Sequence, residues 1–144
     1  MSYSIDVNIL LYASDQSNPR HMAAIGFMKN RISDPELFCI SWLTIMSYMR
    51  IATHASIFSN PLSPDQALGN IESLLNLPRV KVLSEEEGFL DVYRAVTGSF
   101  PVRGNLVPDA HLASILHQHG VLKIYTGDRD FLKFDFLDVR DPFI

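Results

Sequence analysis

The chain has 144 residues, a formal net charge of −4 and one cysteine, Cys39, in an apolar run. This length fits one domain over residues 1–144 that buries a core without cross-links, and a single cysteine excludes a disulfide framework. No apolar stretch approaches the roughly 20 residues that span a bilayer, and no secretory signal pattern begins the chain, so we expect a cytoplasmic protein with no membrane association.

The N-terminal part of the chain switches abruptly from strand to helix. Residues 2–7 alternate polar and apolar side chains and predict a short strand, whereas residues 8–13 carry an apolar helical turn. A second helix is predicted from Pro19 to about Ile32, because proline is favoured at the first helical position. This part therefore predicts one strand followed by two helices.

The next part of the chain repeats this order. Residues 37–40 predict a second strand, and Ser41 is suited to cap a helix that runs from Trp42 to about His54. A further helix begins at Pro64 and continues through Leu75, and residues 80–83 predict a third strand.

An acidic run follows the third predicted strand. We expect Glu85, Glu86 and Glu87 in the first turn of the next helix, where negative charge complements the helix dipole. Residues 98–108, rich in glycine and proline, predict an irregular loop that carries Arg103.

The C-terminal part predicts the last elements of the sheet. The helix after Asp109 ends at Gly120, a natural C-cap, and residues 121–126 predict a fourth strand. A short helix follows Asp128, and residues 136–139 predict a fifth strand at the edge. The alternation of strands and helices predicts an α/β domain with a mostly parallel five-stranded sheet and helices on both faces.

Four aspartates are expected at one end of this sheet. Asp6, Asp109 and Asp128 each follow an apolar run and precede a helix, which would place them at the carboxyl ends of strands, and Asp130 lies two residues beyond Asp128. Taken singly, each of the first three could be an ordinary N-cap, and Asp130 could be a solvated surface acid. Their joint occurrence favours a site, because like charges held together repel unless a divalent cation lies among them.

The residue types around these acids favour a hard cation. Carboxylates suit Mg²⁺ or Mn²⁺, whereas zinc is disfavoured by the single cysteine and by His117 and His119, which point apart on a helix. Asn8 could donate a hydrogen bond to Asp6, and Thr126 could donate one to a ligand carboxylate or a phosphate.

The negative net charge by itself argues against a nucleic-acid partner. Without the four aspartates, however, the remaining 12 acids balance the 12 basic residues. Arg50, Arg103 and Arg129 are candidates for phosphate contacts, although a solvated surface charge is the simpler interpretation of any one of them. Arg50 could instead pair with the acids themselves.

Four ordered motifs, SIDVNILLYA, WLTIMSYMRIATH, RGNLVPDAHLA and TGDRDF, with RDPF closing the chain, make this sequence similar to PIN-domain ribonucleases of the VapC type, the toxins of type II toxin–antitoxin (VapBC) systems. The resemblance spans nearly the whole chain. It implies a PIN-like α/β/α domain, a Mg²⁺ or Mn²⁺ site, endonucleolytic cleavage of structured RNA (tRNA or rRNA), a homodimer and a cognate VapB-like antitoxin.

Residue by residue, the resemblance implies that Asp6, Asp109 and Asp128 bind the metal, that Asp130 is a further acid, and that Asn8 and Thr126 support them. Under the ribonuclease hypothesis, Arg50, Arg103 and Arg129 are candidates for RNA contacts. The apolar stretch Trp42–Phe58, rich in methionine and aromatic residues, is a candidate antitoxin surface, although core packing explains its apolar stripe more simply.

One position departs from the family pattern. The resembling family carries a glutamate three residues before Arg50, where this chain has Ser47, and no acid lies between Glu36 and Asp65 to replace it. The leading hypothesis is a metal-dependent endoribonuclease toxin whose activity Ser47 reduces. The alternative is a catalytically weakened RNA- or antitoxin-binding protein with the same fold. A phosphohydrolase is disfavoured, because Lys123 lies inside a predicted strand and so cannot serve an aspartate nucleophile.

Overall fold

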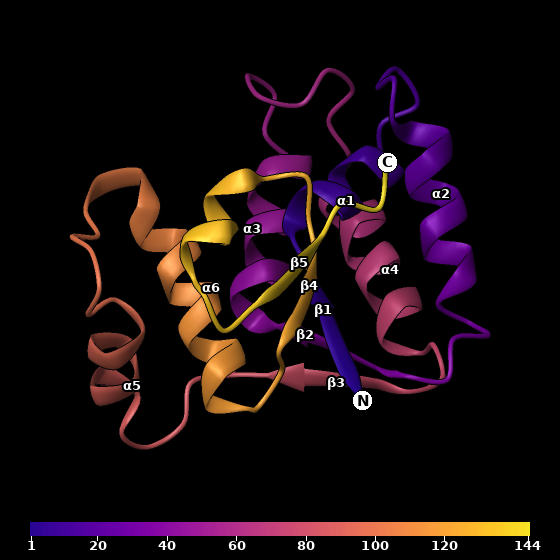
Figure 1. The fold of residues 1–144 in the computed structure, drawn as a ribbon. Coiled ribbons are helices and arrows are strands. Elements are labelled where there is room, and N and C mark those ends of the chain that lie inside the picture. The colour runs from indigo at the N-terminus through magenta and orange to yellow at the C-terminus, as the bar shows by residue number, and fades with distance from the viewer.

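The centre of the fold is a five-stranded sheet in the computed structural model, which describes residues 1–144 (Figure 1). The strand order is β3-β2-β1-β4-β5, and every neighbouring pair is parallel. The strands are β1 (Ser2–Ile5), β2 (Leu37–Ser41), β3 (Val80–Leu83), β4 (Lys123–Tyr125) and β5 (Asp138–Arg140). The predicted parallel α/β sheet is confirmed.

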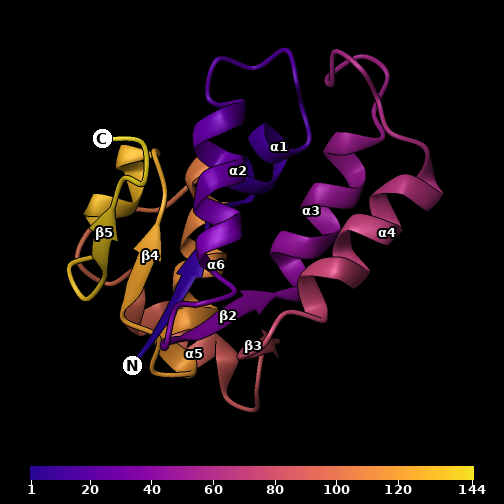
Figure 2. The ribbon, with the colours of Figure 1, turned by 90° about the vertical axis from the view of Figure 1, so that its right-hand side faces the viewer.

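Helices cover both faces of this sheet. They are α1 (Val7–Ala13), α2 (His21–Asn30), α3 (Trp42–Ala52), α4 (Pro64–Leu75), α5 (Phe89–Val96) and α6 (Val107–Gln118), with two 3₁₀ turns, η1 (Gly104–Leu106) and η2 (Arg129–Lys133). Helices α1 to α4 pack on one face, and Figure 2 shows α1 with α2 and α3 with α4 as two neighbouring pairs. Helices α5 and α6 and the turn η2 pack on the other. No helix combines the length and the apolarity needed to cross a bilayer.

The alternation of side chains along the strands creates a core on each face. Tyr3, Phe38 and Ile40 point toward α1, α3 and α4, whereas Cys39 and Ile124 point toward α6. This follows from the two-residue period of a strand, which sends successive side chains to opposite faces. The buried position predicted for Cys39 is confirmed.

Helix caps at two sites follow from local sequence. The backbone N–H of Thr44 donates to the Ser41 hydroxyl at 3.1 Å, which confirms the predicted cap of α3. At α4, Ser63 and Gln66 form a reciprocal capping box. Such caps satisfy N–H groups that have no partner within the helix.

Several predicted boundaries differ from those observed. Strand β1 ends at Ile5 and not at residue 7, and β5 spans Asp138–Arg140 and not residues 136–139. Helix α2 begins at His21 and not at Pro19, because the backbone N–H of Arg20 donates to the Asn18 side chain at 2.8 Å in a turn before the helix. Strand β4 is limited to Lys123–Tyr125, shorter than the predicted residues 121–126. The turn at Asn18 competes locally with helix formation, which the proline signal alone does not reveal.

The prediction that Glu85, Glu86 and Glu87 begin a helix is wrong. Helix α5 begins at Phe89, after Gly88 in the left-handed conformation with φ of 79°. The acidic segment instead lies in a loop that α6 holds in place. The side-chain amide of Gln118 donates to the backbone carbonyls of Glu86 and Glu87 at 3.2 and 3.1 Å.

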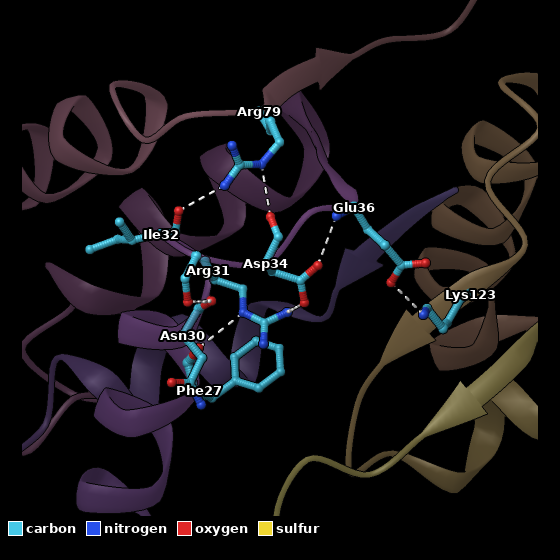
Figure 3. Close-up of polar contacts among 9 residues, drawn as sticks. Phe27, Asn30, Arg31, Ile32, Asp34, Glu36, Arg79 and Lys123 are labelled. Atoms are coloured by element: carbon cyan, nitrogen blue, oxygen red, sulfur yellow. Dashed lines mark hydrogen bonds and ion pairs between the residues drawn. The ribbon is translucent and has the colours of Figure 1, made fainter.

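Paired charges occupy the amino ends of the central strands (Figure 3). The Arg31 side chain is only 8% exposed, lies 3.4 Å from the Asp34 carboxylate and stacks over Phe27 with Cζ 3.9 Å from the ring centroid. Lys123 donates to Glu36 at 2.7 Å. Each of these cations therefore has an acidic partner.

Arg79 ties the same end of the sheet together. Its guanidinium donates at 2.8 Å to the backbone carbonyls of Ile32 and Asp34, which lie between α2 and β2 (Figure 3). Arg79 adopts a φ of 61°, a left-handed conformation that costs energy for a residue with a side chain. These hydrogen bonds compensate part of that cost.

Candidate metal centre

Asp6 lies directly after β1, where the chain turns into α1. Its side chain is 8% exposed, and its Oδ2 atom accepts hydrogen bonds from the Thr126 hydroxyl at 2.9 Å and from the Asn8 amide at 3.4 Å. Burial raises the pKa of Asp6, and the hydrogen bond from Thr126 opposes that rise. The predicted support of Asp6 by Asn8 and Thr126 is therefore present in the geometry.

Thr126 connects Asp6 to the acids that follow β4. The Thr126 hydroxyl donates to Asp6 and accepts from the backbone N–H of Asp128 at 2.9 Å. The Asp128 carboxylate in turn accepts from the backbone N–H of Asp130 at 2.9 Å and caps η2. Because β1 and β4 are neighbours in the sheet, this turn brings Asp128 and Asp130 to the side of Asp6.

Asp109 reaches the same place from a helix and not from a strand. The prediction that Asp109 follows a strand is wrong, since the 3₁₀ turn η1 leads directly into α6. The alternative that it is an ordinary N-cap is wrong as well, because Asp109 is the third residue of that helix. Pro108 is accommodated because the first-turn N–H groups of a helix need no helical partner. Helix α6 runs back along the sheet toward β4, so its first turn lies at the carboxyl ends of the strands.

The acids are close and poorly neutralised. Carboxylate oxygens of Asp109, Asp128 and Asp130 lie within 4.8 Å of one another. Burial, followed by the charges of Asp128, Asp6 and Asp130, raises the pKa of Asp109 to about 7. The one ion pair that involves these four residues is that of Lys133 Nζ with Asp130, at 3.5 Å.

This donor set fits a hard divalent cation. All the available ligand atoms are carboxylate oxygens, which Mg²⁺ and Mn²⁺ prefer, and the excess negative charge that raises the pKa of Asp109 would be offset by a cation. His117 at the end of α6 and His119 just after it have other partners. His117 packs edge-on against Phe136, and His119 Nε2 lies 2.7 Å from the Ser84 carbonyl oxygen.

Position 47, where the family pattern has a glutamate, carries a serine that contacts none of the four acids through a hydrogen bond. It is half-buried on α3, and its hydroxyl makes no hydrogen bond with another residue. Arg50, one turn further along the helix, is exposed and has no ion-pair partner, so the alternative that it pairs with the acids finds no support in the geometry. Arg103 and Arg129 are likewise exposed and free of ion pairs.

Arg20 also lies beside this centre, although no local pattern distinguishes it from other surface arginines. Its Nη1 atom approaches Gly127, the residue before Asp128. Its neighbours come from separate parts of the chain, Tyr12 on α1 and Phe143 near the C-terminus. Only the tertiary structure brings them together, so no spacing in the sequence could have revealed this position.

Two hollows differ in their relation to the acids. One of about 230 Å³ adjoins the centre and is lined by Thr126, Gly127, Asp128 and Arg129, among others. A larger one of about 380 Å³ lies between the α1–α2 and α3–α4 pairs, with a mostly apolar lining and none of the four acids. The larger hollow is therefore suited to a different ligand from that of the acidic centre.

Known proteins resemble this chain in sequence. No protein-family profile matches it. Ribonuclease VapC48 of Mycobacterium tuberculosis is 38% identical over 143 residues, which cover 99% of both chains. Ribonuclease VapC37 of Mycobacterium tuberculosis is 25% identical over 131 residues, covering 91% of this chain and 90% of the relative.

Solved structures resemble it in fold. VapBC2 of Rickettsia felis, bound to a DNA fragment from its promoter, matches with a TM-score of 0.70 and 14% identity, covering 98% of both chains. VapC20 of Mycobacterium tuberculosis, described as a Sarcin-Ricin loop cleaving toxin, matches with a TM-score of 0.66 and 16% identity, covering 96% of this chain and 98% of the other.

Proposed function

The chain belongs to the VapC family of PIN-domain ribonucleases, and from that premise we propose that it is the endoribonuclease toxin of a toxin–antitoxin pair. Its proposed reaction is the hydrolysis of phosphodiester bonds in structured RNA, either tRNA or rRNA, with Mg²⁺ or Mn²⁺ at the acidic centre. We place this activity in the cytoplasm, where such RNA is found.

The observation that supports a metal-dependent reaction is the unneutralised group of acids. Three carboxylates approach within 4.8 Å, and the pKa of Asp109 is raised to about 7. A fold that needed these acids only as caps would have no reason to gather them. The proximity of these carboxylates is best explained by a cation that binds among them during function.

Each residue of the centre has a proposed role. Asp6, Asp109 and Asp128 would hold the cation, with Asp130 as a further acid. When bound, a divalent cation polarises a phosphoryl oxygen and lowers the pKa of coordinated water. Thr126 and Asn8 fix the orientation of the Asp6 carboxylate through their hydrogen bonds. Because burial and the neighbouring carboxylates raise its pKa, the Asp109 carboxyl would have to lose its proton to hold a cation.

RNA contacts would come from cations that have no acidic partner. Arg50, Arg103 and Arg129 are exposed and form no ion pairs, so their charges are available to phosphates. Arg129 adjoins Asp128 and lines the hollow beside it. Arg103 precedes η1, the turn that leads into the helix of Asp109.

The test is cleavage of a panel of tRNA and rRNA fragments in Mn²⁺ or Mg²⁺ against EDTA. This chain, with Ser47, is run beside Ser47→Glu and beside Ser47→Glu combined with Asp6→Asn. We expect Ser47→Glu to increase the rate about 10-fold, because residues that support a metal centre typically change activity 10- to 100-fold. Asp6→Asn should abolish the gain, and EDTA should abolish cleavage by every form.

The same experiment addresses the alternative, a weakened RNA- or antitoxin-binding protein. This reading has one specific support, the absence of any acid near the middle of α3, where Ser47 leaves its hydroxyl without a partner. Tight RNA binding with no metal-dependent cutting by either this chain or Ser47→Glu would favour it. Cutting by this chain would mean that the aspartates suffice without a glutamate.

A cognate VapB-like antitoxin is the proposed protein partner, and the apolar hollow between the helix pairs is its proposed docking site. Only part of the Trp42–Phe58 stretch faces the core, and its exposed residues do not form a concave surface of their own. The hollow is open and is lined by the partly buried side chains of Ile25, Met28 and Leu77. A segment with apolar side chains would bury them. Ile25→Glu should weaken capture of a co-expressed antitoxin without altering RNA cleavage.

We also propose that the chain forms a homodimer. Trp42 and Met46 lie one turn apart on α3 and remain 49% and 59% exposed, which leaves an apolar strip without a partner inside the chain. Sedimentation velocity should give a dimer for the natural chain and a shift toward monomer for Met46→Glu.

A further inference from the structure

Arg20 lies at the acidic end of the sheet although it belongs to the segment between α1 and α2. Its Nη1 atom is 3.4 Å from the position that a Cβ on Gly127 would occupy. This is an ordinary van der Waals distance, so the guanidinium lies next to the backbone of Gly127. The guanidinium is therefore held against the loop that positions Asp128.

Two aromatic rings hold the Arg20 side chain in this place. Its Cζ atom is 5.8 Å from the ring centroid of Tyr12 and 5.2 Å from that of Phe143, and the two rings contact each other with centroids 5.7 Å apart. The contact between Tyr12 and Phe143 joins the C-terminal segment to α1. Stacking on aromatic rings already restricts the long Arg20 side chain in the free protein. Less conformational entropy is therefore lost when Arg20 binds a ligand.

The backbone around this cation is fixed as well. The N–H of Arg20 donates to the Asn18 side chain at 2.8 Å, and the N–H of Phe143 donates to the Asp141 carboxylate at 2.9 Å. The turn before α2 and the C-terminal segment are thus each held by a local hydrogen bond. Arg20 is preorganised from both sides.

The charge of Arg20 is not consumed within the protein. It is exposed and belongs to no ion pair, unlike Arg31 at the other end of the sheet. The Asp141 Oδ2 atom lies 3.9 Å from the same Cβ position on Gly127, yet Arg20 and Asp141 form no ion pair. A fixed and unpaired guanidinium is a ready site for an anion.

Hollows adjoin Arg20 and Gly127. Tyr12, Asn18, Pro19 and Arg20 line one of about 230 Å³. Gly127, Asp128 and Arg129 contribute to another of about 230 Å³. The guanidinium therefore lies beside the acidic centre, where it could contact an extended ligand strand that passes over that centre.

We propose that Arg20 binds a backbone phosphate of the RNA strand, adjacent to the phosphate that is cleaved. This inference rests on the proposed ribonuclease function and adds a substrate-binding residue to it. The acidic centre repels the RNA backbone at the point where the backbone must approach. A guanidinium fixed beside Asp128 offsets that repulsion and orients the strand through its planar pair of N–H donors.

The experiment measures binding of a fluorescent single-stranded RNA oligonucleotide by anisotropy, with Ca²⁺ as the divalent cation and RNA integrity checked on a gel. Arg20→Gln and Arg20→Lys are compared with the natural chain and with Arg94→Gln. Arg94 is a matched control, because it is a highly exposed arginine on α5. Salt is varied over about 50 to 200 mM, since each phosphate contact with single-stranded nucleic acid contributes roughly 0.7 to the slope of log affinity against log salt.

We expect Arg20→Gln to weaken binding about 5-fold and to lower the salt slope by roughly 0.7. Arg20→Lys should keep the slope and lose part of the affinity, because the charge remains but the planar fork does not. Arg94→Gln should match the natural chain. An Arg20→Gln variant with an unchanged slope would overturn the inference, and a lowered melting temperature at unchanged slope would assign Arg20 to the packing of the C-terminal segment.

Failure of the proposed function gives a different result. If the natural chain binds no RNA, the ribonuclease proposal fails and this inference fails with it. If the natural chain binds and cuts RNA while all arginine variants behave alike, only the role of Arg20 is refuted.

Discussion

The carboxyl and amino ends of the same sheet both gather charged side chains, but the acids at the carboxyl end have only one basic partner, Lys133, whereas the charges at the amino end are paired one to one. There, Arg31 lies against Asp34 and Lys123 against Glu36, with their partners already in place. At the carboxyl end, Asp109, Asp128 and Asp130 converge with little neutralisation, and the pKa of Asp109 is raised to about 7.

This difference separates charges that serve stability from charges that serve a ligand. A buried ion pair is satisfied within the fold, and removal of one partner leaves an uncompensated charge. A cluster of like charges lowers stability until something from outside the chain binds to it. Removal of a charged side chain should therefore lower stability at the amino end and raise the stability of the ligand-free protein at the carboxyl end.

The largest expected effect is at the carboxyl end. Asp109→Asn should lower metal-dependent RNA cleavage on the order of 1000-fold, because it removes a proposed cation ligand and the charge that the cation requires. The measurement is the cleavage rate in saturating Mn²⁺, preferably in the Ser47→Glu background. A variant that cuts at the rate of its parent would remove Asp109 from the centre.

At the amino end, the expected loss is of stability and not of chemistry. Arg31→Met should lower the free energy of unfolding by about 3 kcal/mol, since Asp34 would be left without its buried partner. Urea denaturation measures this, with Arg94→Met as the control, because its exposed pair with Asp91 should contribute less than about 0.5 kcal/mol. The Arg31→Met molecules that remain folded should cleave RNA at the normal rate. A lower cleavage rate per folded molecule would contradict the assignment of Arg31 to stability alone.

The smallest expected effect is a pH dependence of the metal-free protein. The folded pKa of Asp109 is about 7 and its ordinary value is 3.8, so the folded state binds more protons across that interval and stability should fall as pH rises through it. Because Asp109 is half-exposed, solvent screening limits this to on the order of 1 kcal/mol. The measurement is urea unfolding in EDTA from pH 5 to 8.

Asp109→Asn isolates this dependence from that of other groups. The difference in stability between the natural chain and the variant should change with pH in EDTA, and the variant should be the more stable of the two at pH 8. Added Mn²⁺ should reverse that order, because the cation favours the ionised carboxylate. Parallel pH profiles in EDTA would contradict the raised pKa of Asp109.

Much of the fold follows from local signals in the sequence. Ser41 caps α3 because its hydroxyl competes for free N–H groups of the first turn, and the alternation in β1 and β2 fixes which side chains enter each core. The parallel order follows from helices between successive strands. Motifs around Asp6 and Asp128 predict acids at the carboxyl ends of strands, and both are found there, because a strand end and the following turn are local features.

Other features depend on contacts between distant parts of the chain. Asp109 arrives on a helix and not after a strand, and Glu85 to Glu87 lie in a loop because Gln118 of α6 holds their backbone. The hydrogen bond from Thr126 to Asp6, the raised pKa of Asp109 and the placement of Arg20 between Tyr12 and Phe143 all join residues remote in sequence. The sequence by itself determined the residue types and the end of the sheet at which Asp6 and Asp128 meet. Their distances, burial and partners were decided by tertiary packing, because electrostatic and hydrogen-bond energies depend on separations that no local pattern encodes.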